Sequence, residues 1–221
     1  MYFPDGKEPP TEHVMNYSLT VPDEVREHFI YLQQCFHNYT AFMKHPDWAL
    51  YSKSSDKLTR LYSRISDTNL LCLKSISICR GEVQQILDAL TNFEMKALYD
   101  DTVEGGKFIY SNLPYETNVV YQKHKKILVV SPRDLTLIAK IYRVSKDEAY
   151  VISKSINIPS HPANKNIVRA TTSLSAWRVK LKEPASGGKK PLCKLTFFGE
   201  IDFKISLFIS KTVGPKTGHL A

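Results

Sequence analysis

The sequence predicts an α+β protein built around an antiparallel sheet, and three observations support this. An amphipathic helical pattern occupies residues 22–44, near the start of the chain. From residue 107 onward, β-type runs follow one another, joined by short segments rich in Pro, Asn, Ser and Asp. No unit of about 30 residues with a helix between two strands interrupts these runs, so consecutive strands should pair antiparallel.

The first predicted element is a helix over residues 22–44. Pro22 followed by Asp23 and Glu24 is a favourable start, because acidic side chains in the first turn interact well with the helix dipole. The apolar side chains at helical spacing are Phe29, Leu32, Phe36, Tyr39 and Met43. Pro46 ends the pattern, and the single apolar face indicates a helix that packs on another element.

The remaining elements follow in order. Between Trp48 and Ile78 the sequence predicts three short strands, separated by polar clusters. Helical patterns come next, at Gly81–Leu90 and more briefly at Phe93–Leu98. The strands expected after them are 107–112, 116–127, 134–144, 148–157, 166–181 and 191–202. A closing helix is predicted at Ile205–Val213, where Phe208 and Ile209 lie on its apolar face.

Composition and charge limit the class of protein. With 43% hydrophobic and 24% charged residues, the chain resembles ordinary folded domains. Its net charge of +8 fits nucleic acid, an anionic membrane surface, or no specific partner. The four cysteines show no zinc spacing and fit reduced thiols in the cytosol. No signal peptide or spanning segment is visible, so we expect an arm at 1–20 and one monomeric domain at 21–221.

Enzyme motifs are missing from the sequence. GxSxG, HExxH, GxxxxGK[ST] and GxGxxG do not occur, and the histidines never stand at metal spacing beside carboxylates. We therefore expect no catalytic residue, metal or cofactor. A site assembled from distant residues stays open, because such sites are defined by geometry rather than by order along the chain.

Two groups of basic residues are candidates for contacting phosphates. The groups are Lys123, Lys125 and Lys126, and Arg178, Lys180, Lys182, Lys189, Lys190 and Lys194. The aromatic stacking motifs of RNA-binding domains and the DNA-binding motifs are absent. A solvated sheet face with loop lysines is therefore favoured over a nucleic-acid interface.

Several segments, in chain order, match the motifs of one known family. They are Trp48–Leu50 with Leu61–Arg64, Val120–Lys126 with Ser131–Leu135, Ser155 with Pro162 and Val168–Ala170, and Leu192–Phe197. These segments resemble the START domain over about residues 22–213, with the Tyr-Gln-x-His-Lys run closest to the ceramide- and phosphatidylcholine-transfer branch. The resemblance implies a helix-grip fold: a curved antiparallel sheet wrapped around a C-terminal helix, with an internal lipid cavity.

The resemblance also implies which residues meet the lipid. The carboxylate, glutamine, asparagine and tyrosine positions of ceramide carriers fall on Asp100, Gln122, Ser153 and Phe197. Lys96 stands where phosphatidylcholine carriers have a phosphate-binding arginine. The alternative for Lys96 and Asp100 is an ordinary surface pair one helical turn apart.

Other positions take supporting roles in the same comparison. Phe208 and Ile209 would line the cavity, although plain core packing gives the same pattern. Arg133, Asp134 and Arg169 are expected to anchor structure rather than to touch lipid.

A membrane-contact loop is expected at the cavity mouth. Its residues are Lys125, Lys126, Ile127, Leu128, Val129 and Val130. The lysines would attract anionic headgroups, at about 1 kcal/mol each, while the aliphatic residues insert. The alternative is that the aliphatic run is the end of a core strand.

Together these observations predict a non-enzymatic, cytoplasmic lipid-transfer protein that associates transiently with membranes. It would carry one ceramide-like lipid or glycerophospholipid in an internal cavity. The expected partners are that lipid and an anionic membrane surface, but not nucleic acid. Two alternatives stay open: a lipid-sensing module without transfer, and a basic nucleic-acid-binding protein.

Overall fold

One ten-stranded sheet organises the protein in the computed structural model, which describes residues 21–126 and 130–205. The strands are β1 (Ala49–Lys53), β2 (Thr59–Ile65), β3 (Leu71–Arg80), β4 (Val103–Leu113), β5 (Thr117–His124), β6 (Arg133–Ser145), β7 (Glu148–Ser155), β8 (Val168–Arg169), β9 (Thr171–Glu183) and β10 (Leu192–Asp202). Their order is β1-β2-β3-β10-β9-β7-β6-β5-β4, with β8 paired to β6 off this path. All pairs except β6–β8 are antiparallel, which confirms the predicted sheet type.

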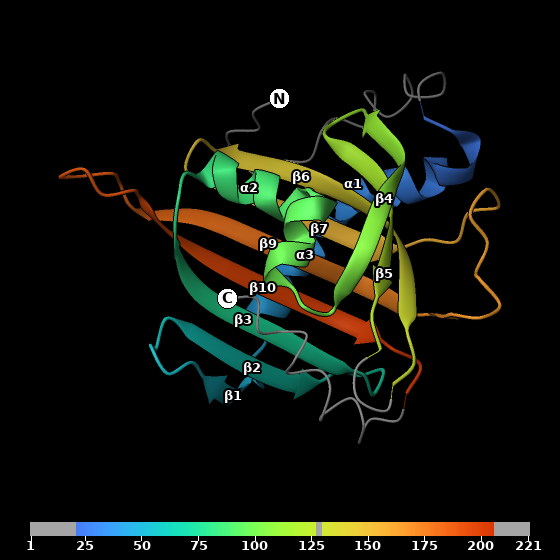
Figure 1. The fold of residues 1–221 in the computed structure, drawn as a ribbon, viewed down its shortest axis with the longest axis horizontal. Helices are drawn as coiled ribbons and strands as arrows, with labels where there is room; N and C mark the ends of the chain where they lie inside the picture. Colours follow the sequence, from blue (N-terminus) through green and yellow to red (C-terminus); the bar gives the residue numbers. More distant parts are fainter. Residues whose placement is uncertain (1–20, 127–129, 206–221) are drawn as a thin grey trace.

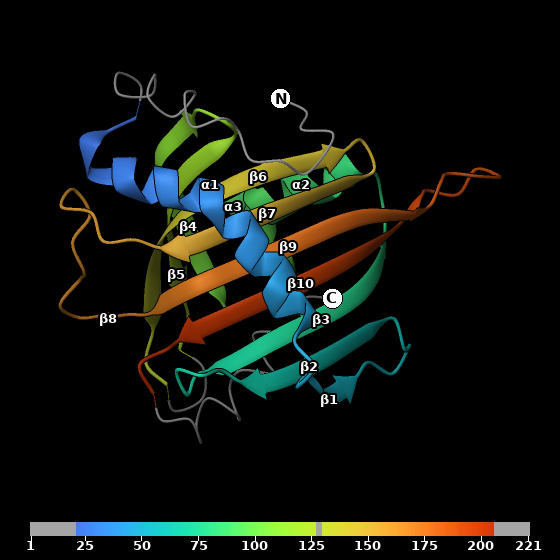
Figure 2. The same ribbon diagram turned by 180° about the vertical axis from the view of Figure 1, so that it is seen from behind.

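Helices lie on both faces of this sheet. The short helices α2 (Val83–Thr91) and α3 (Phe93–Tyr99) lie in front of it in Figure 1. The long helix α1 (Asp23–Lys44) crosses the opposite face diagonally, as Figure 2 shows. We call the α1 side the outer face and the α2–α3 side the inner face.

Three predicted strand boundaries were wrong. The strand at 116–127 stops at His124, where Lys125 and Lys126 become exposed. The strand at 107–112 begins earlier, at Val103, because Gly105 and its neighbour pair with β5. The span 166–181 is two strands, because residues 168–169 first pair in parallel with β6 before the chain turns into β9 at Ala170.

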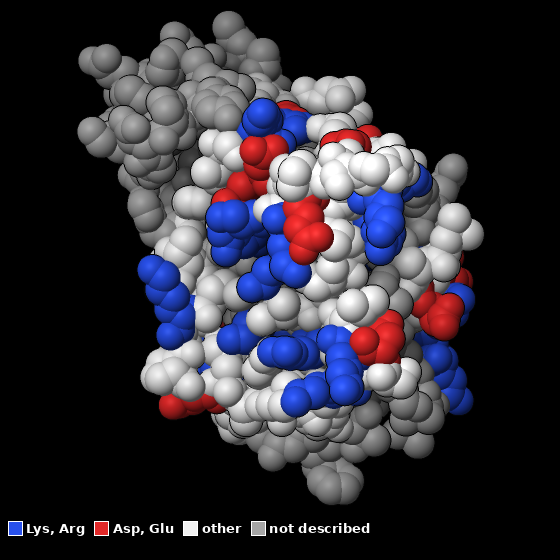
Figure 3. All heavy atoms as spheres, turned by 90° about the vertical axis from the view of Figure 1, so that its left-hand side faces the viewer, with Lys and Arg blue, Asp and Glu red and all other residues white. Residues whose placement is uncertain are grey.

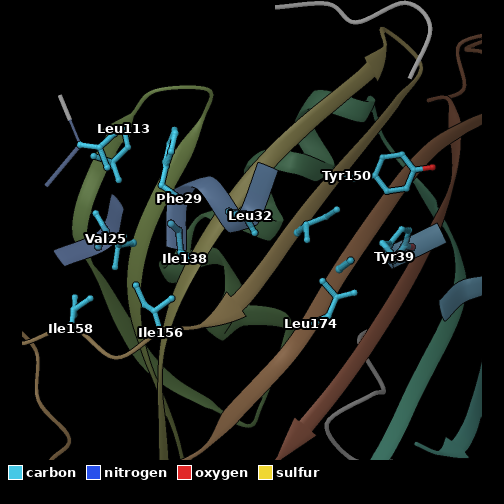
Figure 4. Packing of buried hydrophobic residues seen from close by; sticks show 14 of the residues in the cluster. Val25, Phe29, Leu32, Tyr39, Leu113, Ile138, Tyr150, Ile156, Ile158 and Leu174 are labelled. Carbon is cyan, nitrogen blue, oxygen red and sulfur yellow. The ribbon is translucent and has the colours of Figure 1, made fainter. Parts of the chain in front are cut away.

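The outer face is covered by α1, whose single apolar face predicted a helix that packs on another element. Val25, Phe29, Leu32 and Tyr39 are buried at 0–2% exposure in one cluster with outward side chains of β6, β7, β9 and β10 (Figure 4). Each fully buried side chain of this size contributes about 1.5–3 kcal/mol, so the helix is held by packing more than by its intrinsic propensity. The partners from the sheet include Ile138, Tyr150, Ile152, Leu174, Ala176 and Phe198.

The inner face carries a second, smaller core at one end. Val83 and Leu87 of α2 pack on Val151, Trp177 and Val179. Along β9, Leu174 and Ala176 therefore point to α1, whereas Trp177 and Val179 point to α2. This explains why β9 is apolar on both sides over its central part. Among the described residues, α2 packs on only this end of the inner face.

A buried ion pair joins β6 to β8. Arg169 Nε lies 2.7 Å from Asp134 Oδ1, and the Asp134 side chain is fully buried. The Arg133 guanidinium donates to the carbonyl of Phe203 at 2.8 Å. The prediction that these three polar residues anchor structure is confirmed.

We expect Leu32→Ala to lower the free energy of unfolding by about 2–5 kcal/mol, because it removes a fully buried side chain between α1 and the sheet. Urea unfolding measures this change. Leu98→Ala on α3 is the matched control, because Leu98 is 84% exposed and its loss should cost less than about 0.5 kcal/mol. Equal costs for the two variants would contradict the packing described above.

Candidate functional site

A cavity lies between the inner face of the sheet and the α2–α3 segment. The cavity volume there is about 130 Å³. Ligand sites in proteins commonly enclose about 300–1000 Å³, so this cavity is smaller than a typical ligand site and must widen to take a lipid. The cavity is bordered by inward side chains of β3, β5, β6, β7, β9 and β10, together with residues of α2 and α3.

Most of the cavity wall is apolar. The apolar side chains include Leu73, Leu135, Leu137, Val151, Trp177 and Phe197. These residues come from strands whose alternate side chains face α1 or solvent, so the pleat delivers a continuous apolar surface. Such a wall favours a hydrocarbon group over water.

Glycine at position 199 shapes the wall next to Phe197. A Cβ atom on Gly199 would lie 2.7 Å from the Phe197 ring, closer than real contacts allow. The ring of Phe197 packs against Trp177 with a centroid distance of 4.6 Å. Gly199 therefore lets this aromatic pair take its place in the wall.

Five of the polar side chains that border the cavity form a hydrogen-bonded chain. Lys96 Nζ donates to Gln122 Oε1 at 2.9 Å, and Gln122 Nε2 lies 2.7 Å from His124 Nε2. His124 Nδ1 lies 3.2 Å from the Thr102 hydroxyl, which donates to Asp100 Oδ1 at 2.6 Å. The arrangement is satisfied when neutral His124 accepts at Nε2 and donates from Nδ1. The chain then runs in one direction, from amine to carboxylate.

Burial determines the protonation of this chain. It lowers the pKa of His124 to about 4, with the nearby Lys96 acting in the same direction and Asp100 against it. His124 is therefore neutral at pH 7, as the chain requires. Burial also lowers the pKa of Lys96, and Asp100 partly opposes this. A negative group placed in the cavity next to the Lys96 amine would favour its charged form.

The order of the chain differs from that of a catalytic triad. A triad places histidine between the carboxylate and the hydroxyl, so that the imidazole can accept the hydroxyl proton. Here the Thr102 hydroxyl stands between His124 and Asp100 and gives its proton to the carboxylate. This arrangement orients polar groups and does not activate Thr102 as a nucleophile.

The structure brings the predicted headgroup residues to one cavity. Lys96, Asp100, Gln122, Ser153 and Phe197 all line it. The first three belong to the polar chain, whereas Ser153 and Phe197 lie in the wall on β7 and β10. The alternative of a surface pair for Lys96 and Asp100 is wrong, because Asp100 is buried and both border the cavity.

Two members of the polar chain, Thr102 and His124, were not predicted. His124 stands two residues after Gln122, and residues two apart on a strand share a face. This signal was present in the sequence. Nothing comparable marked Thr102, which lies between α3 and β4.

Other predicted positions are described only in part. Phe208, Ile209 and Ile127–Val129 lie outside the described residues. Lys125 and Lys126 are exposed, whereas Val130 is buried at 6% exposure. Lys123 Nζ forms an ion pair with Glu104 Oε1 at 2.6 Å.

Among residues 21–126 and 130–205, no group of three His, Cys, Asp or Glu side chains is placed to hold a metal ion. No helix in this part of the chain is long and apolar enough to cross a membrane.

Comparison with solved structures shows the same fold in three START-related domains. Human StAR-related lipid transfer protein 5 superposes with a TM-score of 0.76 at 13% identity, over 88% of this chain and 92% of that one. Human STARD10 gives 0.66 at 18% identity, over 92% and 79%. The lipid transfer protein from Xanthomonas axonopodis gives 0.57 at 13% identity, over 78% and 94%.

These structural similarities confirm the predicted α+β helix-grip class. Comparison with curated proteins gave no match. The family model for the START domain matches residues 39–208, which include the whole sheet from β1 to β10 and every member of the polar chain. The chain therefore belongs to the START domain family.

Proposed function

We propose that the protein encloses one lipid molecule in its cavity and carries it between membranes without chemical change. The observation that supports this most directly is the cavity itself, which combines a largely apolar wall with a connected group of polar side chains. That distribution matches an amphiphile. A 16-carbon chain resists entering water by roughly 12 kcal/mol, so a two-chain lipid needs such an enclosure to leave a bilayer.

The cargo we propose is a phosphate-bearing lipid rather than ceramide. An ammonium has three donors, and in the described residues Lys96 gives one of them to Gln122. Its amine is therefore able to meet a phosphate oxygen in the cavity. A charge-assisted bond of this kind is about twice as strong as a neutral one.

The other polar side chains of the cavity argue against ceramide as the cargo. The carboxylate of Asp100 already accepts from the Thr102 amide at 3.0 Å and from its hydroxyl. Both ends of the Gln122 amide are also engaged. At the two remaining positions, Ser153 is shorter than asparagine and Phe197 lacks the hydroxyl of tyrosine. Few groups are left to bind a ceramide amide and its hydroxyls.

Membrane contact is proposed at the connection between β5 and β6. Exposed Lys125 and Lys126 precede the aliphatic run Ile127–Val129, which we propose inserts between headgroups. Because Val130 is buried, it belongs to the protein interior rather than to the inserting run. The lysines would add electrostatic attraction to an anionic leaflet.

Native mass spectrometry tests the cargo. The purified protein should retain one phospholipid per chain and release it to acceptor vesicles in a fluorescence transfer assay. Retained ceramide would contradict the headgroup assignment. A protein that binds no lipid under any loading condition would contradict lipid carriage itself.

Lys96→Met should reduce phospholipid retention at least about tenfold, because it removes the cation but keeps an unbranched side chain of similar length. Lys96→Arg should retain phospholipid. Exposed Lys107→Met is the control for the loss of one lysine. Unchanged phospholipid content in Lys96→Met would remove this residue from the site.

The same interaction should depend on pH. Burial lowers the pKa of Lys96. As the pH rises, the amine therefore loses its charge before the pH reaches about 10.4, the ordinary pKa of lysine. Phospholipid affinity of the wild type should therefore fall as the pH rises toward 10, whereas Lys96→Arg should keep its affinity. A flat profile for the wild type would contradict the role of the charge.

Replacing Leu128 and Val129 together by Asp should abolish transfer between vesicles while leaving retained lipid and thermal unfolding unchanged. Charged side chains oppose insertion of the loop among acyl chains. The matched control replaces Leu50 and Leu58 by Asp, since these are also exposed apolar residues, at 48% and 50%. Transfer at the wild-type rate by the Leu128 and Val129 variant would rule out this membrane contact.

A further inference from the structure

A group of cations lies on the outer face of the sheet, beside α1. Strand register aligns Arg60, Ile76, Thr196 and Arg178 in one row across β2, β3, β10 and β9. The next row sets Lys194 directly opposite Lys180. We call Arg60, Arg178, Lys180 and Lys194 the outer basic patch.

The patch faces the α1 side and is accessible. The Arg178 guanidinium lies 5.6 Å from the centroid of the Tyr150 ring, which packs in the α1 core. Side chains two apart on a strand share a face, so Lys180 lies on the same side as Arg178. Arg60, Lys180 and Lys194 are exposed. Arg178 keeps 34% of its side chain accessible.

More positive charge stands next to the patch. The connection between β9 and β10 carries exposed Lys189 and Lys190, and Lys182 near the end of β9 is 53% exposed. Figure 3 looks onto this end of the molecule, where Lys and Arg side chains outnumber the acidic ones. The structure thus brings the second basic group of the sequence together with Arg60, which comes from a distant strand.

This charge is only partly neutralised within the protein. Glu148 serves two cations: Arg178 Nη2 lies 2.7 Å and Lys180 Nζ 2.9 Å from its oxygens. In the described part of the chain, Arg60 and Lys194 form no ion pair. Lysines placed directly opposite on neighbouring strands repel each other and destabilise the pair. The fold therefore holds a repulsive arrangement that an external anion would relieve.

We propose that the outer basic patch binds the anionic headgroups of a membrane surface. Clusters of four to eight basic residues are typical of sites for anionic lipids, and lysines suit the diffuse charge of a leaflet. The ring beneath Arg178, Tyr150, is buried and gives a base no surface on which to stack. This favours a lipid surface over single-stranded nucleic acid.

The position of the patch separates it from the proposed cavity mouth. In Figures 1 and 2 the β9–β10 connection projects at one end of the sheet, and the β5–β6 connection lies toward the opposite end. A domain attached through the patch can keep its β5–β6 end directed away from that membrane. This surface thus serves attachment, independently of the cargo in the cavity.

Charge reversal of Arg60→Glu with Lys194→Glu tests the patch, because neither residue forms an ion pair with another described residue that the change would break. Binding is measured by cosedimentation with vesicles of phosphatidylcholine and phosphatidylserine in equal amounts, at low salt. The variant should bind at least about thirtyfold more weakly than the wild type. Wild-type binding should fall with added salt and be absent on pure phosphatidylcholine.

The matched control reverses two exposed lysines elsewhere, Lys107→Glu with Lys165→Glu, and should bind nearly as well as the wild type. Retained lipid and thermal unfolding show that each variant is folded and loaded, which separates this test from that of the cavity. The single change Lys194→Glu is a second variant. The wild-type side chains at positions 194 and 180 repel each other, and this change makes their interaction attractive.

Equal vesicle binding by the Arg60 and Lys194 variant and its control would overturn the proposal. So would a wild type that ignores anionic vesicles but binds a single-stranded oligonucleotide in a salt-dependent manner.

Discussion

The packing of α1 against the outer face of the sheet is the contact on which the rest of the structure depends. An antiparallel sheet needs an apolar layer on at least one face, and here α1 supplies it through Val25, Phe29, Leu32 and Tyr39. The main core therefore lies outside the curve of the sheet rather than within it. The inner face needs only a smaller core under α2, and the space beside that core stays free for the cavity.

The polar chain of the cavity follows from the cost of burying polar groups. An amide, an imidazole, a hydroxyl and a carboxylate enclosed in an apolar wall must satisfy one another. From Gln122 to Asp100, each of these side chains has a hydrogen-bond partner within the chain. The Lys96 amine begins the chain and gives one of its hydrogens to Gln122. Its other hydrogens can be donated to a group in the cavity. The same constraint that stabilises the cluster thus gives the cavity a preference for an acceptor.

Ion pairs balance the positive charge on some parts of the protein surface more fully than on others. Lys123 is paired with Glu104 and Arg143 with Glu116, so much of the positive charge is balanced where it stands. The outer basic patch is different, because one carboxylate, Glu148, meets the cations of two residues. Positive charge in excess of its carboxylate partners is thereby gathered on this part of the sheet, where a partner can reach it.

The sequence by itself determined the strand and helix types and the amphipathic helix at 22–44. These depend on local periodicity and turn chemistry, which each segment carries within itself. The family motifs also pointed to Gln122 and Asp100. Only the tertiary structure decided that β10 lies between β3 and β9, that Lys96 reaches Gln122, and that Arg60 aligns with Arg178. Such contacts arise from strand register between distant segments, which is fixed by burial of whole faces and leaves no local trace in the chain.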